Sequence, residues 1–173
     1  MITIEPILLE EVETLRELAI KTFRETFGHD NTEEQLQAFF NSDLSIAVLS
    51  KELTDPESQN YFLKIDGSIV GFLKLNQGSA QTEQKLDNAI EIQRVYILKA
   101  FQGQGLGKKL LEFALEKAYA SGCDWVWLGV WEYNFKAQAL YKKYGFERFS
   151  QHRFMVGDKA DTDWLLKKSL KQA

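Results

Sequence analysis

A glycine-rich loop with adjacent lysines is the part of this sequence whose residue types most directly suggest chemistry. Gly103, Gly105 and Gly107 alternate, and Lys108 and Lys109 add positive charge. The apolar pattern before the loop predicts a β-strand and the pattern after it predicts a helix. A helix N-terminus presents unpaired N–H groups and the positive end of its dipole, and glycines allow an anion to approach the backbone closely. The pattern therefore predicts a phosphate-binding loop.

The glycine spacing separates the known kinds of phosphate loop. A P-loop requires Ser or Thr after Gly-Lys, but Lys109 stands there, and Gln102 lies five positions before Gly107 where a glycine is required. A dinucleotide fingerprint requires a glycine in the sixth place, which is Lys108 here. The spacing that fits is Gln-x-x-Gly-x-Gly, formed by Gln102, Gly105 and Gly107. A plain chain reversal before a helix is the alternative interpretation of the loop.

A second motif follows in the segment 134–146. Asn134 and Tyr141 are seven residues apart, which is nearly two turns of a helix, so both side chains lie on one helix face and can line one ligand. Taken alone, Asn134 could be a helix N-cap and Tyr141 a core residue.

The two motifs together resemble the GNAT superfamily of acyl-CoA-dependent N-acyltransferases. In that superfamily the Gln-x-x-Gly-x-Gly loop binds the pyrophosphate of CoA, and a later Asn opens a helix that carries a Tyr seven residues on and ends before Gly-Phe. The resemblance implies acetyl-CoA as cosubstrate. The residues that it implies as CoA contacts are Val95, Ile97, Gln102, Gly103, Gln104, Gly105, Leu106, Gly107, Lys108, Asn134, Tyr141 and Lys143.

The resemblance also implies catalytic roles. Tyr141 is the predicted acid, since a phenol with a pKa of about 10 stays protonated at neutral pH and can donate to a thiolate whose conjugate acid has a pKa of about 8.5. The N–H of Ile97 is the predicted oxyanion donor. Glu91, at the edge of the central strand, is the predicted base, with a solvated strand-end charge as the alternative. Many relatives carry a second acid where this chain has Gln93.

Composition excludes several other classes of function. The formal charge is -4, from 21 basic and 25 acidic residues, so we expect no nucleic-acid or membrane partner. Cys123 is the only cysteine, and no metal-ligand spacing is present, so we expect no metal. His29 and His152 are further candidates for carrying a proton, although such a histidine more often has a structural role. The start lacks a leader pattern, and we expect a cytoplasmic protein.

The remaining pattern predicts one N-acetyltransferase domain over residues 1–173. We expect an α/β (α+β) fold of the GNAT type, with a mixed central sheet of about seven strands, splayed central strands and helices on both faces. The strands are expected at about 2–6, 61–65, 69–75, 91–97, 125–130, 146–155 and 163–168. The helices are expected at about 9–27, 32–40, 45–55, 106–121 and 134–144, and the polar segment 78–88 is expected to be a loop.

A closer resemblance lies near the two ends of the chain. The segments 23–28 and 152–163 look like bacterial spermine/spermidine N-acetyltransferases. The resemblance implies acetyl transfer to a primary amine, a small polyamine such as spermidine or spermine, by direct attack in a ternary complex. The alternatives are a protein N-terminal or lysine N-acetyltransferase and a non-catalytic CoA-binding module. The last strands could also pair across a homodimer.

Overall fold

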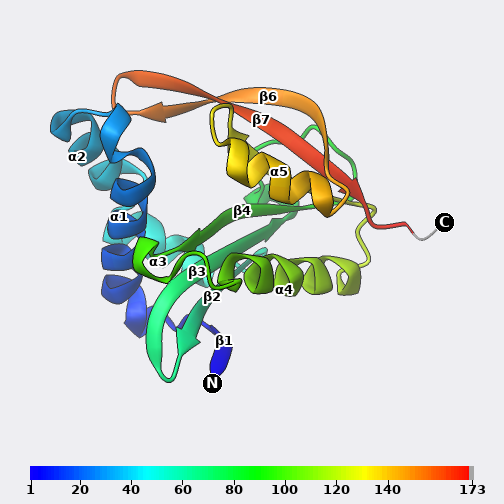
Figure 1. Cartoon of the computed structure of the whole chain (residues 1–173), viewed down its shortest axis with the longest axis horizontal. Helices are drawn as coiled ribbons and strands as arrows, with labels where there is room; N and C mark the ends of the chain where they lie inside the picture. Colours follow the sequence, from blue (N-terminus) through cyan, green and yellow to red (C-terminus); the bar gives the residue numbers. More distant parts are fainter. Residues whose placement is uncertain (172–173) are drawn as a thin grey trace.

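Seven strands form one mixed sheet in the computed structural model, which describes residues 1–171 (Figure 1). Their order is β1-β2-β3-β4-β5-β7-β6, and only β4 and β5 run parallel. The strands are β1 (Ile2–Pro6), β2 (Ser58–Ile65), β3 (Ser68–Gln77), β4 (Ala89–Ile97), β5 (Trp125–Trp131), β6 (Glu147–Val156) and β7 (Lys159–Ser169). The predicted seven-stranded mixed sheet is confirmed.

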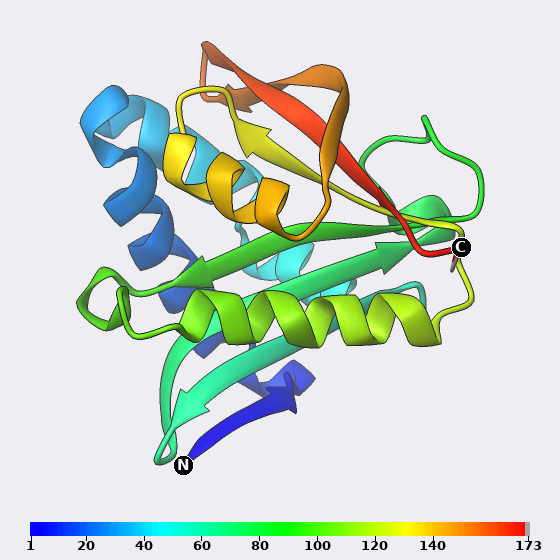
Figure 2. The same ribbon diagram turned by 45° about the vertical axis from the view of Figure 1, so that its right-hand side comes forward.

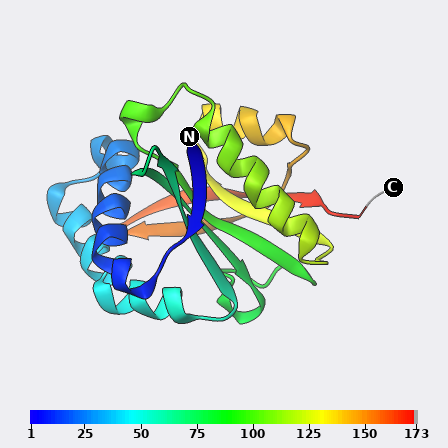
Figure 3. The same ribbon diagram turned by 90° about the horizontal axis from the view of Figure 1, so that it is seen from below.

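Helices cover both faces of this sheet, as the sequence predicts. Within residues 1–171, one face carries α1 (Val12–Phe27), α2 (Glu33–Ser42) and α3 (Ile46–Thr54), and the other carries α4 (Leu106–Ala120) and α5 (Phe135–Lys143). Figure 3 shows the two groups of helices on opposite sides of the strands. In the described chain, no helix is both long and apolar enough to cross a membrane.

Local sequence signals explain where these elements begin and turn. Thr32 accepts a hydrogen bond from the Gln35 N–H and the Gln35 side chain accepts one from the Thr32 N–H, which is the capping box expected at the start of α2. Ser45 caps α3 in the same way through the Val48 N–H. Asp66 and Gly67 both have positive φ, as the tight turn between β2 and β3 requires.

Alternating residues of the central strands supply two separate cores. On β2, Phe62 packs with α1 to α3, while its neighbour Leu63 packs with α4; both are fully buried. The helix α4 contributes one apolar face, which includes the fully buried Leu110. Burial on both faces fixes the register of the sheet, because a shift by one residue would move every side chain to the wrong core.

The parallel strands β4 and β5 separate halfway along their length. They pair from Ala89–Trp125 to Ile92–Leu128 and no further. The register between β3 and β4 shifts at this point, which leaves Gln93 as the extra residue of a β-bulge. A bulge bends its strand, so β4 turns away from β5 (Figure 2). The predicted splayed central strands are confirmed, and their opening positions the candidate site.

Removing part of the α4 core contact should measure how much this packing stabilises the fold. We expect Leu110→Ala to lower the free energy of unfolding by about 2–5 kcal/mol, because it leaves a cavity in a fully buried site. Glu116→Ala, on the exposed face of the same helix, is the matched control and should change stability by under about 0.5 kcal/mol. Urea unfolding of both variants provides the comparison; equal midpoints would contradict this description of the core.

Candidate active site

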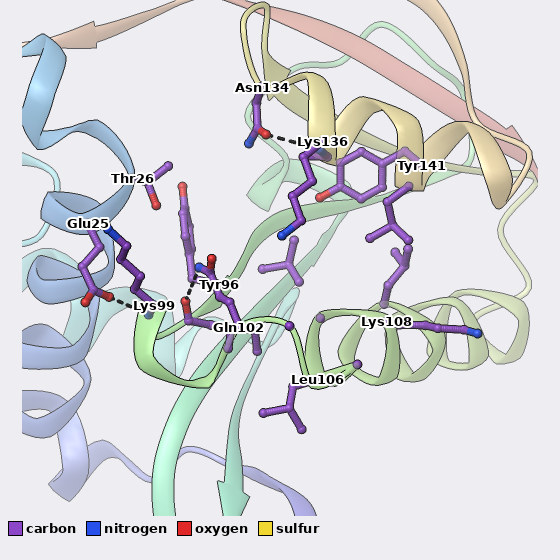
Figure 4. A pocket seen from close by; sticks show the side chains of 18 residues that line it. Glu25, Thr26, Tyr96, Lys99, Gln102, Leu106, Lys108, Asn134, Lys136 and Tyr141 are labelled. Carbon is purple, nitrogen blue, oxygen red and sulfur yellow. Dashed lines mark hydrogen bonds between the residues drawn. The ribbon is translucent and has the colours of Figure 1, made fainter.

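A cavity of about 520 Å³ lies where the glycine-rich loop, β4 and α5 meet (Figure 4). Most of the predicted CoA contacts line it, and they come from three separate parts of the chain. These residues are Val95, Ile97, Gln102, Gly103, Gly105, Leu106, Gly107, Lys108, Asn134 and Tyr141. Gln104 and Lys143 do not line the cavity; both are exposed, and Lys143 is the last residue of α5.

The N-terminus of α4 opens into this cavity without a side-chain cap. Gly105 occupies the N-cap position with a φ of 76°, and no side chain in the described part of the chain caps the helix. The N–H groups of the segment 106–108 therefore have no partner within the helix. Lys108 and Lys136 also line the cavity, and Figure 4 shows Lys136 reaching into it from α5. This combination can hold a phosphate group.

The edge of β4 offers backbone groups to the same cavity. The Leu98 N–H donates to the Val70 carbonyl over 2.9 Å, so this pair of residues is hydrogen-bonded between β3 and β4. Because bonded pairs alternate along an antiparallel ladder, the backbone groups of Val95 and Ile97 point toward β5 instead. There the strands have already separated, and the Ile97 carbonyl accepts from Gln102 Nε2 over 3.0 Å. The opening is thus bordered by the amide of Ile97 and the amide and carbonyl of Val95.

Tyr141 reaches from α5 into this opening. Its side chain is 8% exposed, and among residues 1–171 its hydroxyl has no hydrogen-bond partner. Burial, and to a smaller extent the nearby Tyr96, raise the pKa of Tyr141 above its ordinary value, so the phenol stays protonated through the neutral range. Asn134 caps α5 by accepting from the Ala137 N–H over 3.2 Å and also lines the cavity. The helix-cap alternative and the ligand-facing position therefore coexist at Asn134.

A narrow constriction continues this cavity through the sheet. Its volume is about 110 Å³, and it shares Val95, Tyr96 and Tyr141 with the first cavity. On its other side it shares Tyr96, Gln93 and Asp163 with a third cavity of about 370 Å³. The three cavities therefore adjoin one another, from the uncapped end of α4, past Tyr141, to the face of the sheet that α1 and α2 cover.

Most residues that line the third cavity are uncharged, and carboxylates are the commonest of its charged groups. Four acids and two arginines border it: Asp43, Glu83, Glu91, Asp163, Arg94 and Arg153. Arg94 is already paired with Glu52 over 2.6 Å. The four acids therefore outnumber the cations left to balance them, which are Arg153 and, when it is protonated, His152, and this excess favours a positively charged ligand. The two outer cavities differ in the sign of charge that they present.

Glu91 lies in this third cavity and not in the constriction. Its side chain is 3% exposed, and it accepts hydrogen bonds from Asn76 Nδ2 (3.0 Å) and from the Thr82 N–H and Oγ1 (2.8 and 2.6 Å). The neighbouring Gln93 Oε1 accepts from Asn76 and from the buried Lys74. Burial, followed by the charge of Arg94, lowers the pKa of Lys74.

Tyr96 and Asp163 are among the residues of the site that the sequence motifs do not indicate. Tyr96 lines all three cavities, and burial raises its pKa to about 12. Strand alternation could have identified it, because it lies between Val95 and Ile97 with its side chain on the face opposite to theirs. Asp163 pairs directly with His152 across the β6–β7 hairpin. A tight turn at Gly157 would have predicted that pairing from the sequence.

Comparisons with known proteins agree with this architecture. The family model for the acetyltransferase (GNAT) family matches residues 12–146. An uncharacterized N-acetyltransferase from the pepI 3' region of Lactobacillus delbrueckii subsp. lactis is 45% identical over 150 residues, 87% of each chain. The spermine/spermidine N(1)-acetyltransferase of Bacillus subtilis (strain 168) is 29% identical over 100 residues, which covers 55% of this chain and 66% of that protein.

A solved structure shares the whole fold. The PaiA N-acetyltransferase from Thermoplasma acidophilum, crystallised in complex with coenzyme A, superimposes with a TM-score of 0.78 at 21% identity and covers 98% of this chain and 99% of its own. The family match extends over both motifs, from the glycine-rich loop to Gly145-Phe146. This chain therefore belongs to the GNAT family and is an acetyl-CoA-dependent N-acetyltransferase.

Proposed function

We propose that this enzyme acetylates a primary amine of a small polycation, such as spermidine or spermine, by direct attack on acetyl-CoA in a ternary complex. The observation that carries the proposal is the carboxylate-lined third cavity, which meets the CoA side of the molecule at a constriction lined by Tyr141. Carboxylates attract the ammonium groups of a polyamine and form charge-assisted hydrogen bonds with them. The similarity to the Bacillus subtilis spermine/spermidine enzyme supports the same class of acceptor.

The first cavity fits the cosubstrate. The free amides of the segment 106–108 would hold the pyrophosphate, and Lys108 adds charge beside them. Val95 and Ile97 would pair with the pantetheine arm as an added strand does. Gln104 and Lys143 lie outside the cavity, so contacts there would involve parts of CoA that extend beyond it.

With acetyl-CoA bound in this way, each chemical step can be given to a residue of the site. The amine attacks the thioester carbonyl, and the Ile97 N–H stabilises the oxyanion. As the C–S bond breaks, the Tyr141 hydroxyl donates its proton to the sulfur. Glu91, the base predicted from the sequence, lines the acceptor cavity and not the constriction, so it could reach the reacting nitrogen only through water.

Two other functions make different demands on the same surfaces. A protein N-terminal or lysine acetyltransferase would use the third cavity for a peptide segment, and its acceptor would carry the peptide backbone as well as an amine. A non-catalytic CoA-binding module would need the first cavity but no proton donor. The Tyr141 hydroxyl stays protonated and has no hydrogen-bond partner within the described residues, which favours an enzyme over such a module.

The glycine at position 107 provides a test of the CoA site. No atom lies within 4 Å of where a Cβ would be, and Gly107 lines the cavity, so Gly107→Ala should fold normally yet narrow the cradle. We expect CoA affinity to fall at least about tenfold, equivalent to about 1.4 kcal/mol. Gly28→Ala, equally open but away from the cavity, is the control. Calorimetric titration with CoA measures both; unchanged affinity in the Gly107 variant would exclude a pyrophosphate at this turn.

The acid role of Tyr141 can be separated from its packing. Tyr141→Phe keeps the ring, so CoA binding should persist, while kcat should fall about 10²-fold or more through loss of the proton donor. Tyr144→Phe removes a hydroxyl from the end of the same helix, where it donates to Glu112 over 2.8 Å, and should leave kcat unchanged. Steady-state thiol release at saturating acetyl-CoA gives both values. A full rate in the Tyr141 variant would refute the assignment.

An acceptor panel tests the proposed substrate class directly. Purified enzyme with acetyl-CoA is offered spermidine, spermine, single amino acids, an aminoglycoside and short peptides with a free N-terminus or a lysine. We expect kcat/KM for spermidine or spermine to exceed the value for each peptide at least about tenfold, because the cavity provides several carboxylates for more than one ammonium group. A preference for a peptide would identify a protein acetyltransferase. CoA binding with no turnover of any amine would identify a non-catalytic module.

A further inference from the structure

The constriction contains one carboxylate, and it is not that of Glu91. Within the described chain, the ionisable side chains that line it are Tyr96, Tyr141 and Asp163. The constriction lies between the two larger cavities and shares lining residues with both, so it is the place where we expect acceptor and thioester to meet. A group that takes a proton from the reacting nitrogen must come within hydrogen-bond reach of that nitrogen, directly or through one water. Asp163 is the carboxylate placed for this contact.

Asp163 is one end of a three-member chain of polar side chains. His152 Nε2 lies 3.3 Å from Asp163 Oδ2, and His152 Nδ1 lies 3.4 Å from Glu83 Oε1. The two strands pair these residues directly, His152 on β6 opposite Asp163 on β7. Gly129 on β5 carries no side chain beneath them, and a Cβ there would touch both Asp163 Oδ2 (3.4 Å) and His152 Nε2 (3.5 Å). The histidine and Asp163 are each 18% exposed at the side chain.

The third member, Glu83, belongs to a loop that Glu91 holds in place. Thr82, the residue before Glu83, gives both its N–H and its hydroxyl to the Glu91 carboxylate. Trp127 Nε1 donates to Gln81 Oε1 over 2.8 Å on the other side. The buried Glu91 therefore positions the loop that carries Glu83, and three hydrogen-bond donors already occupy its two oxygens.

The two histidine contacts are compatible with proton transfer from Asp163 to the ring. Nδ1 faces Glu83 and Nε2 faces Asp163, so a neutral ring that carries its proton on Nδ1 can accept a second proton at Nε2 once Asp163 is protonated. The hydrogen bond with Asp163 is the largest cause of a raised pKa at His152, and the charges of Asp163 and Glu83 act in the same direction, while burial opposes them. The ring is thus a stronger base than free imidazole.

We propose that Asp163 accepts a proton from the acceptor ammonium and passes it to His152, which releases it toward Glu83 and solvent. This inference rests on the proposed acetyl transfer. The ammonium gives one proton to the Asp163 carboxylate, which transfers it to Nε2. The neutral amine then forms the C–N bond, the C–S bond breaks, and the thiolate takes a proton from Tyr141. After the attack the acceptor nitrogen loses a second proton to solvent, and the Tyr141 phenolate takes up a proton from solvent to become a phenol again.

Asp163→Asn is the decisive variant. It removes the proton acceptor and the main cause of the raised pKa at His152, so we expect kcat to fall about 10²-fold. We also expect the acid limb of the kcat–pH profile, which the raised pKa places above pH 6.5 in the wild type, to move to lower pH. Asp161→Asn makes the same change two residues earlier on β7 and should leave both unchanged, because within residues 1–171 the only ion pair of Asp161 is with Lys159. The assay is thiol release at saturating acetyl-CoA and amine.

The role of His152 is tested by the dependence of kcat on pH, because His152 acts through Asp163 and does not touch the substrate. Charged groups around it are Glu83 on the loop, Asp163 on β7, Arg153 on β6, Glu91 and Arg94 on β4, and Asp43 after α2. His152→Gln should abolish the limb, whereas a structural role would lower kcat equally at every pH. If Asp163→Asn loses CoA binding through misfolding, the His152→Gln profile decides: loss of the limb supports the relay and an unchanged limb overturns it.

The remaining outcomes separate this inference from the proposed function. Wild-type kcat and an unmoved limb in a folded Asp163→Asn enzyme overturn the relay while acetyl transfer stands. A kcat loss in Glu91→Gln with a moved limb, and neither effect in Asp163→Asn, assigns the proton to Glu91 instead. If the wild-type enzyme acetylates no amine, the proposed function fails and the relay fails with it.

Discussion

The parting of β4 from β5 is the constraint on which the site depends. Two parallel strands would normally satisfy each other's backbone groups along their full length. Here the extra residue Gln93 bends β4 after Ile92, and the backbone of Val95 and Ile97 is left to face an opening. The burial of residues on both sides of the sheet holds the strands apart, because neither can shift register without exposing a core. A gap in the sheet thus becomes a stable binding surface.

The opening connects two regions of opposite charge. One end is formed by the uncapped N-terminus of α4 with Lys108, and the other by the carboxylates around Asp163. If the acceptor is the polycation that we propose, it and the anionic cosubstrate would enter from opposite faces and meet in the constriction. Tyr141 and Tyr96 line the meeting point, both with raised pKa values caused mainly by burial, so both phenols stay protonated there. The sheet thus keeps the basic and acidic cavities on opposite faces, and the tyrosines lie between them.

The parts predicted from the sequence are those with local signals. Strand alternation, the capping box at Thr32 and the glycine spacing each depend on neighbours within a few residues, and the elements and the GNAT family followed from them. All the CoA contacts remain predictions, and of these residues Gln104 and Lys143 do not line the cavity. The place of Glu91 at a strand edge suggests a base, but which cavity it faces depends on the bulge at Gln93 and on long-range packing. Such packing has no period or spacing in the sequence to reveal it.

A structure determined with bound acetyl-CoA would show directly where the cosubstrate lies. We expect the pyrophosphate on the amides of the segment 106–108, the pantetheine arm along Val95 and Ile97, and the thioester sulfur within hydrogen-bond reach of the Tyr141 hydroxyl. A pyrophosphate bound elsewhere, or a sulfur on the far side of the sheet from Tyr141, would contradict this placement.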